Sequence, residues 1–418
     1  MAQSDILVVG GGMAGLAGAL EAAEAGYTVT LIEKEPFLGG RVSRMYRFFP
    51  KLCPPNCGLE LYFRRIKNNP RLTYYTQAQV QSVKGQQGDF TVDIALKPRF
   101  VSTEKCTACG ECTAVCPVER VDEFNYGLGK TKAIYLPHPM AMPPKLAIDQ
   151  ATCRGESCGE CVRACRYDAI DLAMQPRTEQ LHVRSIVLAT GWQPYDPSRL
   201  GDLGYGKYPG VITNVMMERL AASDGPTGGR LLRPGDDREA KRIAFVQCAG
   251  SRDENHLPYC SAVCCMASLK QAAYVREAHP ETQVQMFYMD VRAPGRYEDF
   301  YRKVSKDPAV KIVRGKVAKV SQDAATGDLL LEADDTIYGR KIRTAVDMVV
   351  LATGTVPTPA AEALPGAPLV YDQFGFVTAA GVPGIHPAGA AKRPMDVASS
   401  VRDGTGAALR AIQDVVGG

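Results

Sequence analysis

Fourteen cysteines in a chain of 418 residues are the side chains best suited to chemistry in this sequence. Eight of them form two runs, and the first, from Cys106 to Pro117, has the spacing C-x2-C-x2-C-x3-C-P. Thiolates at this spacing are typical of [4Fe-4S] sites. Zinc sites made of four cysteines use separated C-x2-C pairs instead, so the spacing favours iron–sulfur clusters over zinc.

The second run repeats the pattern with spacings of x4, x2 and x3 between its cysteines. In a two-cluster arrangement the fourth cysteine of each run ligates the cluster of the other run. We therefore predict one cluster on Cys106, Cys109, Cys112 and Cys165, and another on Cys153, Cys158, Cys161 and Cys116. Arg166 stands where proline is usual in such a run, and its positive charge is expected to raise a cluster's potential.

A third group of cysteines follows a strand expected at 242–246 and comprises Cys248, Cys260, Cys264 and Cys265. Cys260 and Cys264 have helical i, i+4 spacing, which predicts that both lie on one face of a helix, near an N-terminus that favours thiolate. This group is predicted to ligate a third cluster beside the flavin inferred below. Buried free thiols are the alternative, because adjacent cysteines on one cube are unusual.

Cys53 and Cys57 form a separate pair whose role the sequence leaves open. A redox-active thiol pair, substitute cluster ligands and local packing are all compatible with their spacing, and local packing ranks first. The five histidines are scattered and belong to no hydrolytic signature.

The N-terminal segment predicts a dinucleotide site. A buried strand at 5–9 leads directly into Gly10-Gly11-Gly12-Met13-Ala14-Gly15 and a helix to about residue 25. Glycines in this strand–helix context allow a tight turn and let the backbone approach a pyrophosphate at the helix N-terminus. A second strand at 28–32 ends at Glu33, which is placed to accept a hydrogen bond from a ribose 2′-hydroxyl.

Three later segments change the expected dinucleotide from NAD to FAD. Residues 38–41, Leu-Gly-Gly-Arg, resemble the FAD-binding segment of flavoproteins with two dinucleotide-binding domains, two apolar strands end in Ala-Thr-Gly, and residues 384–390 resemble the segment that closes over the flavin. In that last segment Ala390 replaces the usual acidic residue. The predicted cofactor-binding residues are Gly10, Gly12, Ala14, Gly15, Glu33, Lys34, Gly40, Arg41, Thr190, Gly191, Gly389 and Val397.

Composition narrows the class of protein. The net charge of +4, without a long basic run, gives no support for a nucleic-acid partner. The sequence contains neither a membrane-spanning apolar stretch nor a signal peptide, so we expect a cytoplasmic protein whose membrane contact, if any, comes through a partner.

The expected fold class is α/β: a flavoprotein with two dinucleotide-binding domains, like thioredoxin reductase, with an inserted two-cluster ferredoxin domain. The segment after the strand at 242–246 carries cysteines and charges where a second glycine-rich turn would lie, which predicts that the nicotinamide site is missing. The expected boundaries are FAD domain 1–98, ferredoxin insertion 99–176, FAD-domain continuation and crossover 177–235, degenerate nicotinamide-type domain 236–350 and FAD domain 351–418.

Several segments together resemble the A subunit of heterodisulfide reductase and its relatives. They are Gly-Gly-Arg-Val at 39–42, Phe-Pro-Lys-Leu-Cys-Pro-Pro at 49–55, Gln-Cys-Ala-Gly-Ser-Arg-Asp-Glu at 247–254, and Tyr-Cys-Ser-x-x-Cys-Cys at 259–265. Within this family, the Cys-Pro-Pro-Asn-Cys-Gly-Leu-Glu segment, the length and the lack of C-terminal ferredoxin modules are most similar to the A subunits of quinone-interacting membrane-bound oxidoreductases.

The resemblance implies a cytoplasmic FAD and [4Fe-4S] oxidoreductase subunit without a dedicated catalytic residue. The implied partners are a second flavin and iron–sulfur subunit of the same kind, APS (adenylylsulfate) reductase of dissimilatory sulfur metabolism, and a membrane subunit with haem b and iron–sulfur clusters that exchanges electrons with menaquinone. Attachment to the inner face of the cytoplasmic membrane would then be peripheral, through those partners.

Three alternatives remain at this point. The chain could be the electron-bifurcating flavin subunit of a soluble heterodisulfide-reductase-like complex, with hydrogenase or formate dehydrogenase partners. It could also be a stand-alone NAD(P)H-dependent flavoenzyme, or a scaffold that has lost its cofactors.

Overall fold

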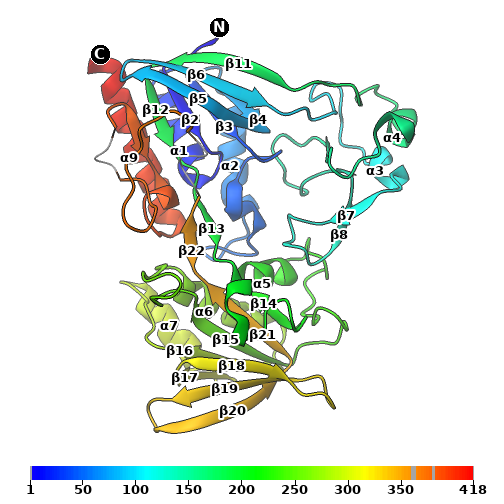
Figure 1. Cartoon of the computed structure of the whole chain (residues 1–418), viewed down its shortest axis with the longest axis vertical. Coiled ribbons are helices and arrows are strands. Elements are labelled where there is room, and N and C mark those ends of the chain that lie inside the picture. Colours follow the sequence, from blue (N-terminus) through cyan, green and yellow to red (C-terminus); the bar gives the residue numbers. More distant parts are fainter. Residues whose placement is uncertain (1, 359–363, 379–381, 418) are drawn as a thin grey trace. The chain divides into compact units, whose positions relative to one another are not determined.

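The computed structural model describes residues 2–358, 364–378 and 382–417. The chain forms two compact units, one made of residues 1–192 and 357–418 and the other of residues 193–356 (Figure 1). It leaves the first unit through β13 (Trp192–Pro194) and returns through β22 (Thr355–Pro357), and these two strands pair with each other.

The first unit is built on a five-stranded parallel sheet. Its strand order is β23 (Ile385–Pro387), β12 (Ser185–Leu188), β2 (Ile6–Val9), β3 (Val29–Glu33), β4 (Leu72–Thr76). The three central strands are almost wholly apolar because both faces of the sheet are covered. One face packs against α1 (Met13–Glu24), α2 (Asn56–Lys67) and α9 (Val397–Gly417).

The other face of this sheet packs against a second sheet of four strands. Their order is β1 (Ala2–Gln3), β11 (Arg177–Val183), β6 (Asp89–Leu96), β5 (Ala78–Gln86). Alternate residues of β5, β6 and β11 point into the shared core, which includes Val80, Val92 and Ile94. The five-stranded parallel sheet is therefore buried on both faces.

Helices α1 and α9 approach closely where both carry glycine. A Cβ atom on Gly404 would collide with the carbonyl oxygen of Ala14, and one on Gly18 would lie 3.0 Å from the carbonyl oxygen of Gly404. Only residues without a side chain permit this approach, so the C-terminal helix is pressed against the helix that follows the first glycine-rich turn.

The cysteine-rich insertion begins and ends at one point of the four-stranded sheet. Leu96, the last residue of β6, and Arg177, the first of β11, are antiparallel partners, and residues 97–176 form the excursion between them. It contains the short helices α3 (Glu111–Val115) and α4 (Glu160–Ala164) and the strands β7 (Glu119–Val121), β8 (Lys130–Lys132), β9 (Ile134–Tyr135) and β10 (Ala147–Ile148). A small core of its own includes Phe100, Ile134 and Leu146.

The second unit also has a five-stranded parallel sheet. Its order is β14 (Val211–Thr213), β21 (Met348–Thr353), β15 (Arg242–Ala249), β16 (Gln283–Tyr288), β17 (Val310–Arg314). The helices are α5 (Asn214–Ala221), α6 (Cys264–Ala278) and α7 (Tyr297–Ser305), and the antiparallel strands β18 (Val317–Gln322), β19 (Leu329–Asp335) and β20 (Arg340–Val346) form a separate sheet.

The expected start of the second domain at residue 236 differs from the structure, in which the second unit already begins at Gln193. The reason is that β14 pairs in parallel with β21, so residues 211–213 supply an edge strand to the second sheet. Within the described ranges, no helix has both the length and the hydrophobicity to cross a membrane.

Candidate flavin and iron–sulfur sites

The first glycine-rich turn is shaped by backbone contacts that exclude side chains. Gly10 has φ +107°, and a Cβ atom there would collide with the carbonyl oxygen of Ala189. A Cβ atom on Gly15 would collide with the carbonyl oxygen of Gly10. At Gly12, by contrast, a Cβ atom would have no atom within 4 Å. The turn is therefore tightly packed at Gly10 and Gly15, whereas the space next to Gly12 is open.

The groups around that space suit a pyrophosphate. Gly12 is the N-cap of α1 and provides no side-chain cap, so the N–H groups of the first turn can donate to a ligand. Thr190 Oγ1 is buried and has no hydrogen-bond partner among the described residues. A Cβ atom on Gly40 would lie 2.9 Å from the Cα atom of Gly12, which places the Gly-Gly-Arg segment directly against the turn. These features fit the FAD predicted from the sequence.

Glu33 lies at the end of β3 with its carboxylate facing the glycine-rich turn. Its Oε2 accepts a hydrogen bond from the Gly11 N–H at 2.7 Å, and its Oε1 accepts one from the Glu35 N–H at 2.8 Å. Burial raises the pKa of this carboxyl to about 7, although the two backbone donors oppose the shift. The carboxylate can still accept a hydroxyl hydrogen bond, as predicted for a ribose.

Arg41 ties the Gly-Gly-Arg segment to the surrounding structure. Its Nε donates to the Trp192 carbonyl at 2.5 Å, its Nη1 donates to the Tyr126 hydroxyl at 3.3 Å, and its guanidinium lies 4.8 Å from the centre of the Trp192 ring. Lys34 is exposed, Ala14 is buried in α1, and Gly191 has φ +73°. Arg41 is thus held by residues of the crossover and of the insertion.

Near the C-terminus, an acidic residue that the sequence reasoning missed contacts the predicted flavin-closing segment. Gly389 donates its N–H to Asp403 Oδ2 at 2.9 Å, and Lys392 Nζ lies 2.9 Å from Asp403 Oδ1. Asp403 is on α9, which begins at Val397 as predicted. Ala390 replaces the usual acidic residue of this segment, and the following helix supplies an acidic residue instead. In the sequence, only the aspartate directly before Gly404 pointed to this residue.

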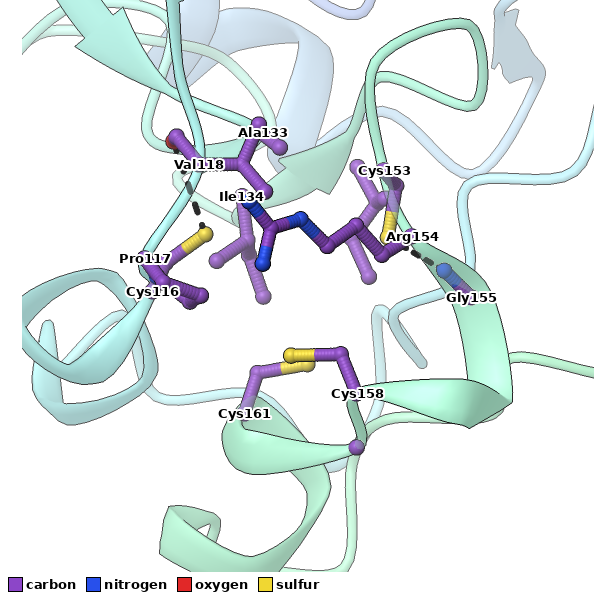
Figure 2. A pocket seen from close by; sticks show the side chains of 12 residues that line it. Cys116, Pro117, Val118, Ala133, Ile134, Cys153, Arg154, Gly155, Cys158 and Cys161 are labelled. Carbon is purple, nitrogen blue, oxygen red and sulfur yellow. Dashed lines mark hydrogen bonds between the residues drawn. The ribbon is translucent and has the colours of Figure 1, made fainter.

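In the insertion, four cysteines from both runs surround one pocket. Cys116, from the first run, lines it together with Cys153, Cys158 and Cys161 from the second. Figure 2 shows these thiols around a common space, with the side chain of Arg154 reaching across it. No three His, Cys, Asp or Glu side chains in the described ranges are close enough to ligate a single metal ion.

The other predicted set is also brought together. Burial, together with the neighbouring thiols of Cys106, Cys165 and Cys109, raises the pKa of the Cys112 thiol to about 11. Cys112 and Cys161 occupy equivalent positions, each the second residue of a short helix that follows a left-handed glycine. The crossed pairing of the runs thus matches the arrangement expected of a two-cluster module.

One local turn recurs at three of the cysteines. Cys106 Sγ accepts the Ala108 N–H at 3.4 Å, Cys153 Sγ accepts the Gly155 N–H at 3.4 Å, and Cys260 Sγ accepts the Ala262 N–H at 3.3 Å. The three donors have φ values of +58°, +66° and +59°. Each turn aims a backbone dipole at sulfur, which stabilises negative charge there.

The third cysteine group gathers in the second unit. Cys248 has φ +55°, at a register shift between β15 and β21, and burial raises the pKa of its thiol to about 11, with Cys265 and Cys260 among the neighbouring groups. Burial also raises the pKa of Cys264 far above its usual range, with Cys265, Cys248 and Cys260 contributing. All four thiols are therefore near one another.

The prediction that Cys260 and Cys264 share a helical face is wrong. Helix α6 begins at Cys264, and the left-handed conformation of Ala262 breaks the helical path before it. Residues 250–263 form an irregular loop, in which Ser261 Oγ accepts the Thr355 N–H at 2.9 Å. This loop stands where a nicotinamide-binding domain would carry a short glycine-rich turn.

Cys57 is the second residue of α2, and Cys53 lies just before this helix. Cys57 is exposed, and the Cys53 backbone forms an isolated bridge with Phe48. The Leu59 side chain of the same helix would lie 3.2 Å from a Cβ atom on Gly39. Cys57 is thus on the helix that packs against the Gly-Gly-Arg segment, and Cys53 lies in the loop before it.

Comparisons with known proteins agree with both sites. Residues 5–58 match the family described as FAD dependent oxidoreductase, and residues 100–119 match the 4Fe-4S binding domain. Solved structures show the fold, which confirms the predicted fold class: thioredoxin reductase from T. acidophilum aligns over 100% of both chains with TM-score 0.56 and 16% identity, and that from Lactococcus lactis over 99% of both with TM-score 0.55 and 13% identity.

The similar curated proteins are A subunits of heterodisulfide reductases. The chain is 41% identical to the iron–sulfur A subunit, numbered 2, of the CoB–CoM heterodisulfide reductase of Methanopyrus kandleri, over 99% of this chain and 64% of the relative. It is 40% identical to the A subunit of the ferredoxin/F(420)H(2)-dependent CoB–CoM heterodisulfide reductase of Methanosarcina acetivorans, over 99% and 53%. The chain thus spans between half and two thirds of the length of these relatives.

A third relative, the A subunit of the H(2):CoB–CoM heterodisulfide,ferredoxin reductase of Methanothermobacter marburgensis, is 37% identical over 99% of this chain and 64% of its own. The predicted FAD and [4Fe-4S] cofactors agree with both family matches. We conclude that the chain combines an FAD-dependent oxidoreductase segment with a 4Fe-4S binding segment, and that over nearly its whole length it is similar to the A subunits of heterodisulfide reductases.

Proposed function

We propose that this chain joins a flavin, which exchanges one or two electrons, to clusters that carry one electron each, within a soluble heterodisulfide-reductase-type complex. The single observation that carries the proposal is the pocket in which Cys116 of the first run meets three cysteines of the second. That pocket lies in an insertion of the same unit that holds the dinucleotide turn. One compact unit thus holds both kinds of electron carrier.

We assign the ligands of the clusters as follows. The first cluster is held by Cys106, Cys109, Cys112 and Cys165, and the second by Cys153, Cys158, Cys161 and Cys116. The third is held by Cys248, Cys260, Cys264 and Cys265. The third assignment is supported by the turn at Cys260, whose N–H to sulfur bond and left-handed donor repeat those at Cys106 and Cys153.

In this proposal the residues of the chain bind the flavin and the clusters and adjust their reduction potentials, and no residue performs covalent catalysis. When bound, the flavin supplies the exchange between electron pairs and single electrons. The glycine turn and the first turn of α1 bind the pyrophosphate, Glu33 orients the ribose, and Thr190 and Arg41 complete the pocket. Burial disfavours ionisation of the cysteine thiols. The positive charge of bound iron would offset this effect and hold the thiols as thiolates.

The names of the relatives suggest the electron partners. Ferredoxin, F(420)H(2) and H(2) appear in them, so we infer that this chain exchanges electrons with a ferredoxin-type carrier and with the dehydrogenase or hydrogenase that supplies its complex. Electron bifurcation at the flavin is the corresponding mechanism, and the loop at 250–263 supports a route that does not begin with hydride from NAD(P)H.

A second candidate is the quinone-linked complex. Its support is the Cys-Pro-Pro-Asn-Cys-Gly-Leu-Glu segment at 53–60, which is similar to the A subunits of quinone-interacting oxidoreductases. In that case the partners are a haem-b membrane subunit that meets menaquinone, APS reductase, and a second flavin and iron–sulfur subunit. The chain is then held at the cytoplasmic membrane by those partners.

Anaerobic affinity purification of the tagged chain from native cells distinguishes these two proposed functions. Both the soluble and the detergent-solubilised fractions are analysed. Recovery of soluble hydrogenase or dehydrogenase chains without haem supports the first proposal. A co-purifying haem-b protein that responds to menaquinone analogues overturns it in favour of the second. Rapid flavin bleaching by NADPH in the isolated chain would contradict both.

A further inference from the structure

Arg99 is a buried cation near Cys106, one of the proposed ligands of the first cluster. The residue is 7% exposed. Its guanidinium donates to three main-chain carbonyls, those of Lys145 at 2.7 Å, Leu146 at 2.8 Å and Pro36 at 2.9 Å. It also lies 3.3 Å from Thr76 Oγ1. Every one of these acceptors is a neutral oxygen.

A buried cation without an anion is energetically costly. Arg99 forms no ion pair with any carboxylate in the part of the chain that the structure describes. Burial lowers its pKa to about 10, and the anionic forms of Tyr135, Cys106 and Tyr74 oppose the shift. Arg99 therefore remains charged at neutral pH, and the Cys106 thiolate is the group near it that becomes an anion when iron is bound.

Lys145 links the buried guanidinium to Cys106. Its carbonyl accepts from Arg99 Nη2, and its own Nζ donates to the Cys106 carbonyl at 2.5 Å. Cys106 itself is 7% exposed. Two cations are thus connected to one proposed ligand of the first cluster, and of these Arg99 is buried and poorly screened by water whereas Lys145 is half-buried.

The second cluster has a different environment. Arg154 lines its pocket but is exposed. Arg163, which donates to the Cys158 carbonyl, is exposed and forms an ion pair with Glu160 at 2.7 Å. Exposed and paired charges are weakened by solvent and salt. The side chain of Arg120, which is also buried near this set, is paired with Asp149 and Glu123. The two ligand sets are thus similar in local geometry but differ in buried positive charge that has no carboxylate partner.

We propose that Arg99 is a positioning residue that raises the reduction potential of the cluster held by Cys106, Cys109, Cys112 and Cys165 above that of its neighbour. The inference rests on the ligand sets of the proposed function. Reduction adds one electron to the cluster and breaks no bond, and the added negative charge is compensated by the guanidinium. Electrons that enter the insertion accordingly reside on the Cys106 cluster.

The test is a redox titration of the full-length, cluster-loaded protein followed by electron paramagnetic resonance, with iron and FAD measured on each sample. Cys109→Ala identifies which signal belongs to the Cys106 cluster. Arg99→Gln is expected to lower the reduction potential of that cluster by at least about 59 mV, which is a tenfold change in its reduced-to-oxidised ratio at a given potential. The other signal stays in place.

Three further variants show whether a change in potential comes from the charge of Arg99. Arg99→Lys retains the charge but not the planar donor fork, and it is expected to keep the potential close to the original. Arg154→Gln is expected to leave the Cys106 signal unchanged. Lys145→Gln, which removes the second charge, is expected to lower the same signal even if Arg99→Gln cannot hold iron.

The proposal is overturned if Arg99→Gln and Lys145→Gln leave the potential unchanged, if both signals move together, or if Arg99→Lys loses iron as readily as Arg99→Gln. A failure of the ligand assignment looks different. In that case Cys109→Ala retains both cluster signals and its full iron content, whatever the Arg99 variants do.

Discussion

Leu96 and Arg177 face each other as antiparallel partners, although the whole cysteine-rich insertion lies between them in the sequence. The insertion therefore begins and ends at neighbouring positions of one sheet. Replacing residues 97–176 with a short glycine-containing turn is expected to leave the two sheets of the first unit folded, whereas FAD binding weakens because Tyr126 of the insertion contacts Arg41. Iron content should fall by about eight atoms, the content of two [4Fe-4S] clusters. Absorbance spectroscopy and iron analysis measure both, and a shortened variant that unfolds or loses all of its iron would contradict the prediction.

Two glycines of the first turn should respond differently to the same substitution. Gly12→Ala places a methyl group in open space, so folding should be unaffected while FAD binding is lost or greatly weakened. Gly15→Ala drives the methyl group into the Gly10 carbonyl and should destabilise the protein itself. Thermal unfolding and FAD content separate these outcomes, with Gly406→Ala, also in open space, as the neutral control. Full FAD occupancy in Gly12→Ala would count against the proposed pyrophosphate site.

The proposal that the left-handed turn at Cys260 holds a cluster can be tested by changing the side chain of Ala262. Ala262 has φ +59°, where a β-branched residue is strained by roughly 1–2 kcal/mol or more and glycine is unstrained. Ala262→Val should therefore remove about four iron atoms per chain, the content of one [4Fe-4S] cluster, whereas Ala262→Gly should retain them. Cys57→Ala serves as the matched thiol control and should keep all iron. Equal iron in all three variants would exclude a cluster at this turn.

Glu33 predicts a pH dependence. Its folded-state pKa of about 7 lies above the ordinary value of 4.5, so between these pH values the folded apoprotein binds more protons than the unfolded chain. The free energy of unfolding should then decrease, by about 3 kcal/mol, as the pH rises through this window, and level off above it. Denaturant unfolding of apoprotein measures the slope, and Glu33→Gln should flatten it.

FAD binding should show the opposite trend at the same residue. A ribose hydroxyl donates to the ionised carboxylate, so binding releases a proton below pH 7 and the affinity should increase with pH up to that point. Fluorescence titration of the apoprotein with FAD measures this. A pH-independent affinity in the original protein would show that Glu33 does not contact the ribose.

The sequence was most informative where function depends on short, contiguous spacing. The first glycine turn, the two cysteine runs and the grouping of Cys248 with Cys260 follow from residue types at fixed distances, because the backbone must meet a ligand there. The inserted position of the ferredoxin module also followed, since its cysteines interrupt the landmarks of the flavin domain. The structure places 97–176 between β6 and β11, close to the expected 99–176.

Long-range relationships were not predictable in this way. Residues 193–235 belong to the second unit because β14 pairs with β21, a contact between segments far apart in sequence. Arg99 and Asp403 gain their importance from carbonyl and amide groups of distant segments, and no local pattern marks them. Cys260 lies outside α6 because Ala262 adopts a left-handed conformation, which alanine rarely does and which its type does not reveal.

The glycine-mediated contact between α1 and α9 has a consequence for the order in which cofactors are acquired during synthesis. Residues 389–404 complete the wall beside the first turn, but they leave the ribosome long after residues 10–15. The cysteines of the insertion are all available much earlier and pack into a core of their own. If the insertion holds the proposed clusters, we therefore expect their loading to begin while the chain is still growing, whereas stable flavin binding is expected only after the last helix has been made.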